Sequence, residues 1–236
     1  RDSISAYASM VFVGNIDTPR LRTWVTTYLG GLPGTRRAET WRDIGLGHPR
    51  GQKSLTVESG MEPKGLVFLV FHGPHSWSRD DANDMRMLTD ALNIRLREVL
   101  REDMSGVYNV SVWGDISRRP LQNRYVYVYF GCDPKNIDVL KKAVFTVVAA
   151  IKKNGVGDDY ITKLKQQRIR AHETELQQNG FWLDELADAY RYGDDPRAIL
   201  DFQPWVDKIS SARIQAAARR FLPTSQYVLG VLKPTP

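Results

Sequence analysis

The alternation of apolar and polar residues predicts an ordered series of strands and helices from about residue 53 onward. Short β-rich runs indicate strands, and apolar residues three and four positions apart indicate helices. The predicted strands are Leu55–Glu58, Leu66–His72, Val107–Trp113, Tyr125–Phe130 and Tyr227–Leu232. The predicted helices follow Ser78, Asp133 and Asp158, or span Phe181–Tyr192 and Ser211–Phe221. This β-β-α-β-β-α-α-α-α-β order is too uneven for a doubly wound sheet. It predicts an α+β fold, with a layered antiparallel or mixed β-sheet packed against helices.

Several local patterns add detail to these elements. The almost continuously apolar run Leu66–Phe71 predicts a strand that is buried on both faces. In Tyr125–Phe130 tyrosines and valines alternate, which places them on opposite faces of a sheet. Ser78 with Asp81 predicts a capped helix start. The polar helix after Asp158 is expected to end at Asn179-Gly180.

The N-terminal part of the chain has a different pattern. Tyr7–Val13 reads as a strand, and Asp17 or Thr18 can cap a following helix with Pro19 at its first position. Residues 35–52 have no sustained period and are rich in Gly, Pro and Arg, which is typical of a linker. We therefore expect three parts: residues 1–34, a linker at 35–52, and an α+β unit at 53–236.

Composition narrows the possible partners. The 33 basic and 27 acidic residues give a net charge of +6 and a pI near 9.4. The basic pairs are scattered, so a solvated surface is favoured over a nucleic-acid groove. The longest apolar runs are far too short to span a bilayer, which predicts no membrane span. Cys132 is the only cysteine, so no intrachain disulfide is expected. The start at Arg1, without a signal-like segment, favours a piece of a longer protein over a mature product.

No self-sufficient catalytic or metal site is evident in the sequence. None of the four histidines stands in an H-E-x-x-H or H-x-x-E-H zinc motif. His72 and His75 flank a Gly-Pro pair, which indicates a turn rather than a metal site. No G-x-S-x-G elbow and no phosphate-binding glycine loop is present. Cys132 has no histidine near it in sequence and reads as a small core residue.

Arg101 and Tyr108 are the remaining candidates for a functional site. They are seven residues apart across a predicted helix-to-strand junction. In the structural interpretation, Arg101 complements the helix C-terminus and Tyr108 starts a strand. In the functional interpretation, both donate hydrogen bonds to a carbonyl oxygen that gains charge during peptide hydrolysis. The residues alone leave both interpretations open.

The segment around this pair resembles a known family. Leu96–Val110 is similar to the Arg-Glu-x-x-Gly-x-x-Tyr region in the C-terminal half of the pitrilysin/insulinase zinc metallopeptidases, the inverzincins. Four other segments also resemble the family, including its bacterial branch: Val11–Asp17, Tyr28–Pro33, Asn179–Leu183 and Tyr190–Gly193. Each segment is weak alone, but their order and spacing make the resemblance specific. One departure is Ser105, which stands where the family has glycine, and Gly106 is expected to take the turn instead.

The resemblance implies a clamshell enzyme of two halves, built from α+β units like those of the mitochondrial processing peptidase. Zinc would be held by the N-terminal half, in the same protein or a partner subunit, and this chain would bind none. Residues 1–34 would end a preceding unit, and residues 53–236 would form the final one. Arg101 and Tyr108 would reach the substrate, an unfolded peptide or small protein, near the zinc. The chain alone would be inactive.

Two other functions stay open beside this one. The same fold could serve as a catalytically inactive structural or regulatory subunit, as in relatives that have lost the zinc motif. The tyrosines of Tyr125–Phe130 could alternatively form a stacking platform for nucleic acid. Because bacterial relatives of this branch are often exported, the resemblance favours the periplasm, with the cytoplasm as second choice.

Overall fold

The computed structural model describes residues 9–32, 41–45 and 47–235. The chain divides into two compact units, and each combines two stretches of sequence. The smaller unit comprises Arg1–Ile44 with Gln167–Val206, and the larger comprises Gly45–Gln166 with Asp207–Pro236.

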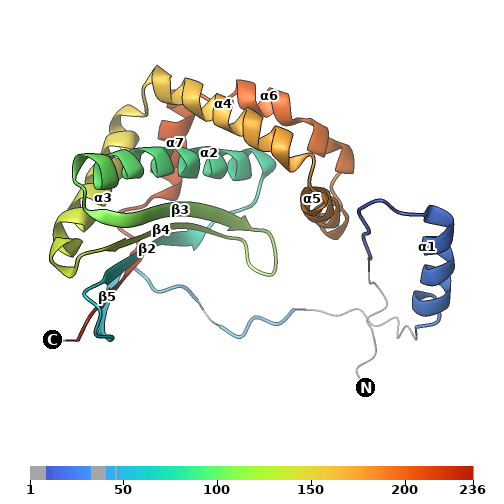
Figure 1. The fold of residues 1–236 in the computed structure, drawn as a ribbon, viewed down its shortest axis with the longest axis horizontal. Helices are drawn as coiled ribbons and strands as arrows, with labels where there is room; N and C mark the ends of the chain where they lie inside the picture. Colours follow the sequence, from blue (N-terminus) through green and yellow to red (C-terminus); the bar gives the residue numbers. More distant parts are fainter. Residues whose placement is uncertain (1–8, 33–40, 46, 236) are drawn as a thin grey trace. The chain divides into compact units, whose positions relative to one another are not determined.

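The larger unit is built on a five-stranded mixed sheet (Figure 1). Its strands are β1 (Gln52–Glu58), β2 (Gly65–Pro74), β3 (Val107–Ser117), β4 (Asn123–Cys132) and β5 (Tyr227–Lys233). The strand order is β1-β5-β2-β4-β3, with β1 and β5 parallel and the other pairs antiparallel. All five predicted strands are present, and the predicted layered α+β architecture with a mixed sheet is confirmed.

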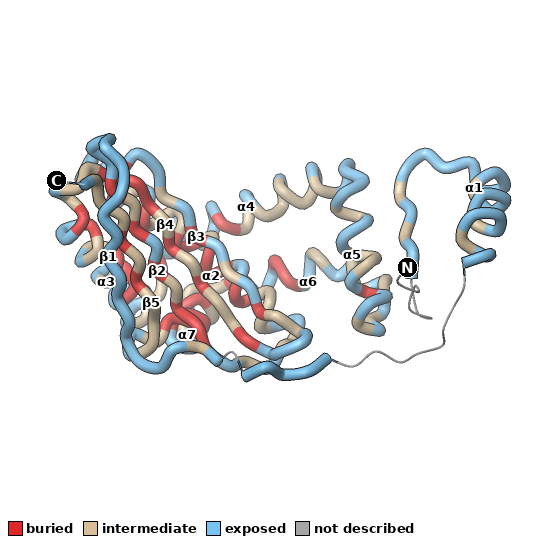
Figure 2. The backbone as a smooth tube through the Cα atoms, turned by 90° about the horizontal axis from the view of Figure 1, so that it is seen from below, coloured by how far each residue is buried: buried red, intermediate tan, exposed pale blue. Residues whose placement is uncertain are grey.

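Three helices pack on one face of this sheet. They are α2 (Arg79–Leu96), α3 (Ile137–Asn154) and α7 (Ser211–Phe221). Figure 1 shows α2 running along β3 and β4 in this layer. Figure 2 shows the buried residues concentrated between the helices and the sheet, while β1 is exposed along its whole length. Each fully buried large apolar side chain in this layer, such as Phe71 or Leu92, contributes about 1.5–3 kcal/mol through loss of contact with water.

The helix starts follow the expected chemistry. Ser78 Oγ accepts a hydrogen bond from Asp81 N at 3.0 Å, which confirms the predicted cap of α2. Asp133 accepts from Lys135 N at 3.0 Å and opens the short turn η3 (Pro134–Asn136) that leads into α3. Helix α3 is capped at its C-terminus by Gly155, whose φ is +70°. A Cβ there would lie 2.3 Å from Ser211 Oγ, so this junction requires glycine.

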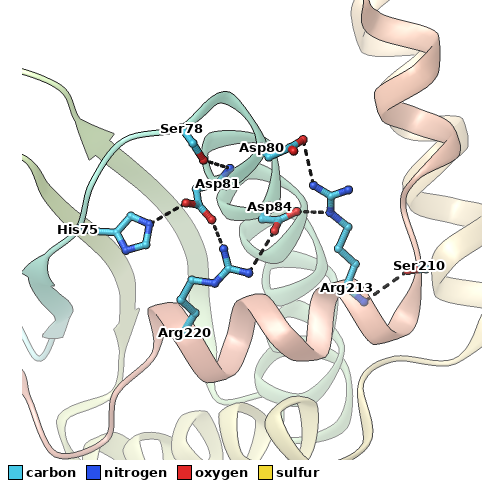
Figure 3. A network of polar contacts seen from close by, with 8 residues as sticks. All are labelled: His75, Ser78, Asp80, Asp81, Asp84, Ser210, Arg213 and Arg220. Atoms are coloured by element: carbon cyan, nitrogen blue, oxygen red, sulfur yellow. Dashed lines mark hydrogen bonds and ion pairs between the residues drawn. The ribbon is translucent and has the colours of Figure 1, made fainter.

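An ionic network joins the start of α2 to α7 (Figure 3). At its centre the Asp84 carboxylate, which is 4% exposed, binds Arg213 and also Arg220, the latter at 3.5 Å. Asp81 contacts Arg220 and also His75, whose Nε2 lies 3.1 Å from its Oδ2. Buried charges are tolerated only when paired, so this network fixes how the two helices pack.

The smaller unit is helical in its described part. It includes α1 (Thr18–Trp24), the π-helical turn η1 (Val25–Leu29), α5 (Asn179–Tyr192) and η4 (Pro196–Leu200). Two helices contribute to both units along the sequence, α4 (Asp158–Glu175) and α6 (Phe202–Asp207). His172 stacks on Phe202 with ring centroids 3.7 Å apart. Asp17, rather than Thr18, caps α1 by accepting from Arg20 N at 3.1 Å.

Two sequence expectations for this unit need correction. Asn179 and Gly180 do not end a helix; they form the first turn of α5, and the break falls at residues 176–178. Residues 9–13 of the expected strand Tyr7–Val13 are not in a strand, while Tyr7 and Ala8 lie outside the described residues. Most of the expected linker at 35–52 also lies outside them or has no regular structure. Within the described ranges, no helix is both long and apolar enough to cross a membrane.

Candidate functional site

The sheet face opposite α2, α3 and α7, here called the open face, carries no helix of the larger unit's described residues. In β2 the side chains on the helix-covered face, such as Val67 and Leu69, are buried, whereas Phe68 on the open face is 39% exposed. The expectation that this strand is buried on both faces is therefore wrong. Its continuous apolar run arises because the open face is itself apolar.

Aromatic rings from three strands cluster on the open face. Trp113 stacks on Tyr127 with centroids 5.1 Å apart, and Tyr127 stacks on Tyr125 at 5.8 Å. Phe68 lies 5.7 Å from the Tyr127 ring and 6.0 Å from the Trp113 ring. The tyrosines of β4 share this face and its valines lie on the other, as predicted, and Val126 and Val128 are buried there. Trp113 is 45% exposed, so the cluster offers an aromatic surface to a partner.

Tyr108 joins this surface through a β-bulge. Val107 pairs with Cys132 and Asn109 pairs with Gly131, so Tyr108 is the extra residue between them. A bulge re-aims side chains, and it is a common feature beside functional sites. A Cβ on Gly131 would lie 3.8 Å from Tyr108 Cδ2 and 3.4 Å from Leu66 Cδ2, so the phenol ring lies near Gly131 on the open face. Tyr108 is 61% exposed.

Arg101 lies in η2 (Arg97–Asp103), a π-helical segment that continues α2. Leu100 anchors this segment in the core, and Arg101 is exposed. Met104 N donates to Val99 O at 3.1 Å and Gly106 N donates to Leu100 O at 2.9 Å, which closes the segment. Among the residues that the structure describes, the Arg101 side chain forms no hydrogen bond or ion pair, with Tyr108 or with any other residue. Both side chains are thus accessible, and each is anchored by its own element.

The turn between Arg101 and Tyr108 depends on Ser105 for its backbone conformation and on Gly106 for its packing. Ser105 has a φ of +48°, in the left-handed region that favours glycine. Gly106 is needed for packing, because a Cβ there would lie 2.6 Å from Leu140 Cδ2. The expectation that Gly106 takes the turn is therefore wrong, since Ser105 adopts the turn conformation itself.

A polar cluster of His48, His72 and Tyr125 lies on the open face, at the end of the sheet opposite to Tyr108. His48 Nε2 is 3.0 Å from Tyr125 Oη, and its ring centroid is 5.1 Å from that of His72. His72 is 2% exposed, and neither of its ring nitrogens has a hydrogen-bond partner within the described part of the chain. Burial, with smaller effects from His48 and Arg124, lowers the pKa of His72. His75 is paired with Asp81 and does not join this cluster.

The described residues contain no group of three His, Cys, Asp or Glu side chains that could hold a metal ion. Cys132 is buried, and burial, with a smaller effect from Asp133, raises its pKa to about 11. Because the thiolate is the nucleophile, this cysteine is suited to packing rather than chemistry.

Comparison with known proteins identifies the family to which this chain belongs. The family model described as the Peptidase M16 inactive domain matches residues 5–168. The chain belongs to this family. The M16 peptidases include the pitrilysin/insulinase type that Leu96–Val110 resembles, so the resemblance is confirmed.

Relatives of this M16 domain carry the name zinc protease. The probable zinc protease PqqL of Haemophilus influenzae is 23% identical over 227 residues, which cover 94% of this chain and 24% of that protein. The crystal structure of the periplasmic protease PqqL from Escherichia coli superposes with a TM-score of 0.74 at 20% identity, covering 94% of this chain and 25% of that one. The ferredoxin protease FusC in complex with Arabidopsis ferredoxin superposes with a TM-score of 0.76 at 20% identity, covering 94% and 24%. These likenesses establish the fold, and the chain spans about a quarter of the length of each of these proteins.

Two features of the open face were not predicted from the sequence. The bulge at Tyr108 is one, although the run Val-Tyr-Asn-Val does break the alternation of β3. The aromatic cluster across Phe68, Trp113 and Tyr127 is the other. It depends on strand order, which the sequence pattern does not contain.

Proposed function

We propose that this chain forms the substrate-facing part of a two-half zinc metalloendopeptidase whose zinc site lies on the other half. The family supports this, since it is described as the inactive domain of M16 peptidases and its named relatives are zinc proteases. The division into residues 1–34, a linker and a final unit at 53–236 is part of this proposal. The proposal also includes a partner for this chain, which is an N-terminal zinc-binding half in the same protein or in another subunit.

The open face is the wall that an unfolded polypeptide would meet. Its aromatic cluster offers large rigid rings to apolar side chains, and such rings recognise varied sequences because they depend little on hydrogen-bond patterns. An unfolded chain exposes apolar side chains that a folded protein buries. This wall would therefore favour unfolded peptides or small proteins.

Arg101 and Tyr108 would assist hydrolysis at the zinc site of the other half. The observation that carries this role is the bulge, which places the Tyr108 phenol on the open face and leaves it 61% exposed. A guanidinium and a phenol are both hydrogen-bond donors at neutral pH. As the scissile carbonyl gains negative charge, donors fixed beside it would stabilise the transition state more than the ground state. When bound on the other half, zinc would supply the activated water.

Location and the alternative functions belong to the same proposal. A periplasmic location is supported by the relative PqqL from Escherichia coli, which is a periplasmic protease. Nucleic-acid binding is disfavoured because the stacking of Trp113 on Tyr127 occupies ring faces that a base would need. The inactive structural or regulatory subunit is the second candidate, and the family description is compatible with it as well. An intact H-x-x-E-H motif in the complete protein would favour the protease, and its absence would favour the subunit.

The deciding experiment uses the complete protease and a quenched fluorogenic peptide. Arg101→Ala and Tyr108→Phe should each lower kcat about 10–1,000-fold while zinc content stays at one per protein. Arg97→Ala, in the same η2 segment and also exposed, is the matched control for the first variant. Tyr190→Phe, at a tyrosine that is 64% exposed, is the control for the second.

Activities within twofold of wild type for both test variants would reject the catalytic role. The 236-residue chain alone should cleave no peptide and should bind no stoichiometric zinc. Peptidase activity with bound zinc in this chain would reject the proposal that the zinc site lies on the other half of the protease.

A further inference from the structure

A pocket of about 660 Å³ lies within the larger unit, away from the open face. Its walls come from the end of α2 and η2, from α3, and from the turn that leads into α4. Val99 and Met104 form one side, and Val147, Ile151 and Val156 form the apolar floor. Neither Arg101 nor Tyr108 lines it. Its volume is in the range typical of sites for small organic ligands.

The pocket is held in shape by contacts that need no ligand. Ser211 Oγ accepts from Val156 N at 3.0 Å and donates to Val156 O at 2.6 Å, which pins the α3–α4 turn to α7. At the end of α2, Arg95 Nη1 donates to Glu98 Oε2 at 2.7 Å and to Tyr160 Oη of α4 at 2.5 Å. A preformed pocket avoids the ordering cost that weakens binding to a mobile one.

The charge around the pocket favours an anion. Arg95 is neutralised by Glu98, so these two side chains add no net charge. Lys142 also lines the pocket, is exposed, and forms no ion pair with any described residue. Asp138, one turn earlier on α3, is paired with Lys141 at 2.7 Å and interacts only more weakly with Lys142. The pocket therefore combines an apolar interior with one available cation.

We propose that this pocket binds an aliphatic carboxylate, with its chain against the apolar floor and its carboxylate facing Lys142. A linear aliphatic chain suits the valines, isoleucine and alanines that make up much of this lining. The polar side chains of the lining are those of Arg95, Lys142, Thr146, Asn154 and Tyr160. The single lysine selects an anionic head group over a cationic or neutral one. This site is independent of the proposed protease function.

The test measures binding of decanoate to the 236-residue chain by calorimetry, with methyl NMR to locate it. Decanoate should shift the methyl signals of Val99 and Met104. Decyltrimethylammonium has the same chain length and the opposite head-group charge, and it should bind at least fivefold more weakly. Lys142→Glu should weaken decanoate binding about fivefold or more, because a nearby opposite charge becomes a like charge. Lys153→Glu, an equal charge change at an exposed position on α3 outside the pocket, should leave it unchanged.

A second pair of variants tests the cavity itself. Ala150→Trp should fill the pocket and weaken decanoate binding at least tenfold, while Ala149→Trp, at an exposed neighbour outside the lining, should have no effect. If Ala150→Trp fails to fold, Thr146→Trp tests the same point, because Thr146 is exposed and also lines the pocket. Undetectable decanoate binding, or equal affinity in the filled and control variants, would overturn the proposal. Equal affinity for both head groups, or binding only of an apolar peptide, would overturn it as well.

Discussion

The ring of Tyr108 lies near the backbone of Gly131, with 3.8 Å between Tyr108 Cδ2 and the position that a Gly131 Cβ would occupy. The bulge in β3 turns Tyr108 toward the open face, and the missing side chain at Gly131 leaves room for the phenol beside it. A residue 23 positions later in the chain thus determines where this phenol can lie. Several consequences of this geometry and of the surrounding fold can be measured.

Replacing Gly131 with valine should displace Tyr108. The new side chain would begin 3.1 Å from Asn109 Oδ1 and would occupy the space beside the ring. We expect the free energy of unfolding to fall by about 1–2 kcal/mol, as for other overpacked sites, and the complete protease to lose activity with its zinc content unchanged. Gly230→Val is the control, because the Cβ there meets only ordinary contacts beyond 3.7 Å. Equal effects of the two variants in urea unfolding and in the peptidase assay would contradict the assigned geometry.

Ser105→Gly should stabilise the chain. Ser105 adopts a φ of +48°, which costs a residue with a side chain about 1–2 kcal/mol. Glycine removes this cost but adds freedom to the unfolded chain, so the expected gain is about 0.5–1 kcal/mol. Urea unfolding measures it. Ser59→Gly, at an exposed serine that is not among the positive-φ residues, should be neutral or slightly destabilising.

Identical substitutions at Phe68 and Phe71 should differ strongly in cost. Phe71 is fully buried between the sheet and the helices, so Phe71→Ala should cost about 3–5 kcal/mol. Phe68 is 39% exposed on the open face, and Phe68→Ala should cost only about 1 kcal/mol. In the complete protease, Phe68→Ala should raise KM for an unfolded substrate more than it lowers kcat. Similar stability losses at the two positions would show that the open face is covered in solution.

Asp84→Asn should destabilise the larger unit. The carboxylate is 4% exposed and pairs with two arginines, so its removal leaves guanidinium groups poorly compensated. We expect a loss of about 2–4 kcal/mol by chemical denaturation. Asp80→Asn is the matched control, because Asp80 is 71% exposed and its ion pair with Arg213 should contribute less than about 1 kcal/mol.

The stability of the chain should fall between pH 7.5 and pH 5.5, in part because of His72. Burial lowers the pKa of this imidazole, so the folded state keeps it neutral while the unfolded state protonates it below about pH 6.5. Stability is therefore present above pH 6.5 and is lost as the pH falls toward the folded-state pKa. His72→Phe keeps a ring at the site and should flatten this dependence, with a gain of about 1 kcal/mol at pH 5.5 because the unpartnered nitrogens are removed. An unchanged pH dependence of the urea midpoint would contradict this role. His75 also has a lowered pKa, mainly through burial, and should preserve part of the slope in the variant.

The sequence predicts local elements well because their causes are local. The cap at Ser78, the alternation of Tyr125–Phe130 and the helix Ser211–Phe221 depend on neighbouring residues, and the structure confirms each of them. The short helix α6 was not predicted, because six residues are too few to show a helical period. The burial of Leu66–Phe71 was mispredicted because an apolar run is compatible with helices on both faces or with an apolar open face. Strand order decides between these, and it is not a local property.

The candidate pair Arg101 and Tyr108 could likewise be predicted only in part. The spacing and residue types of Arg101 and Tyr108, taken together with four other segments, supported the family resemblance, which the family match confirms. Their geometry could not be derived, because the bulge depends on the register of β3 against β4. The left-handed turn at Ser105 was missed because the pattern suggested that glycine would take it.

The insertion of β5 between β1 and β2 also bears on how this protein folds. Among the residues that the structure describes, β1 pairs only with β5, so residues 52–58 can join the sheet only after Tyr227–Lys233 has been synthesised. Pairings across so long a stretch are slow to form, and β2 presents an unpaired edge until then. During synthesis, the middle of the sheet would stay exposed almost until the end of this segment. A nascent chain that ended before Tyr227 would lack β5 and would leave the β2 edge open to pairing with strands of its neighbours.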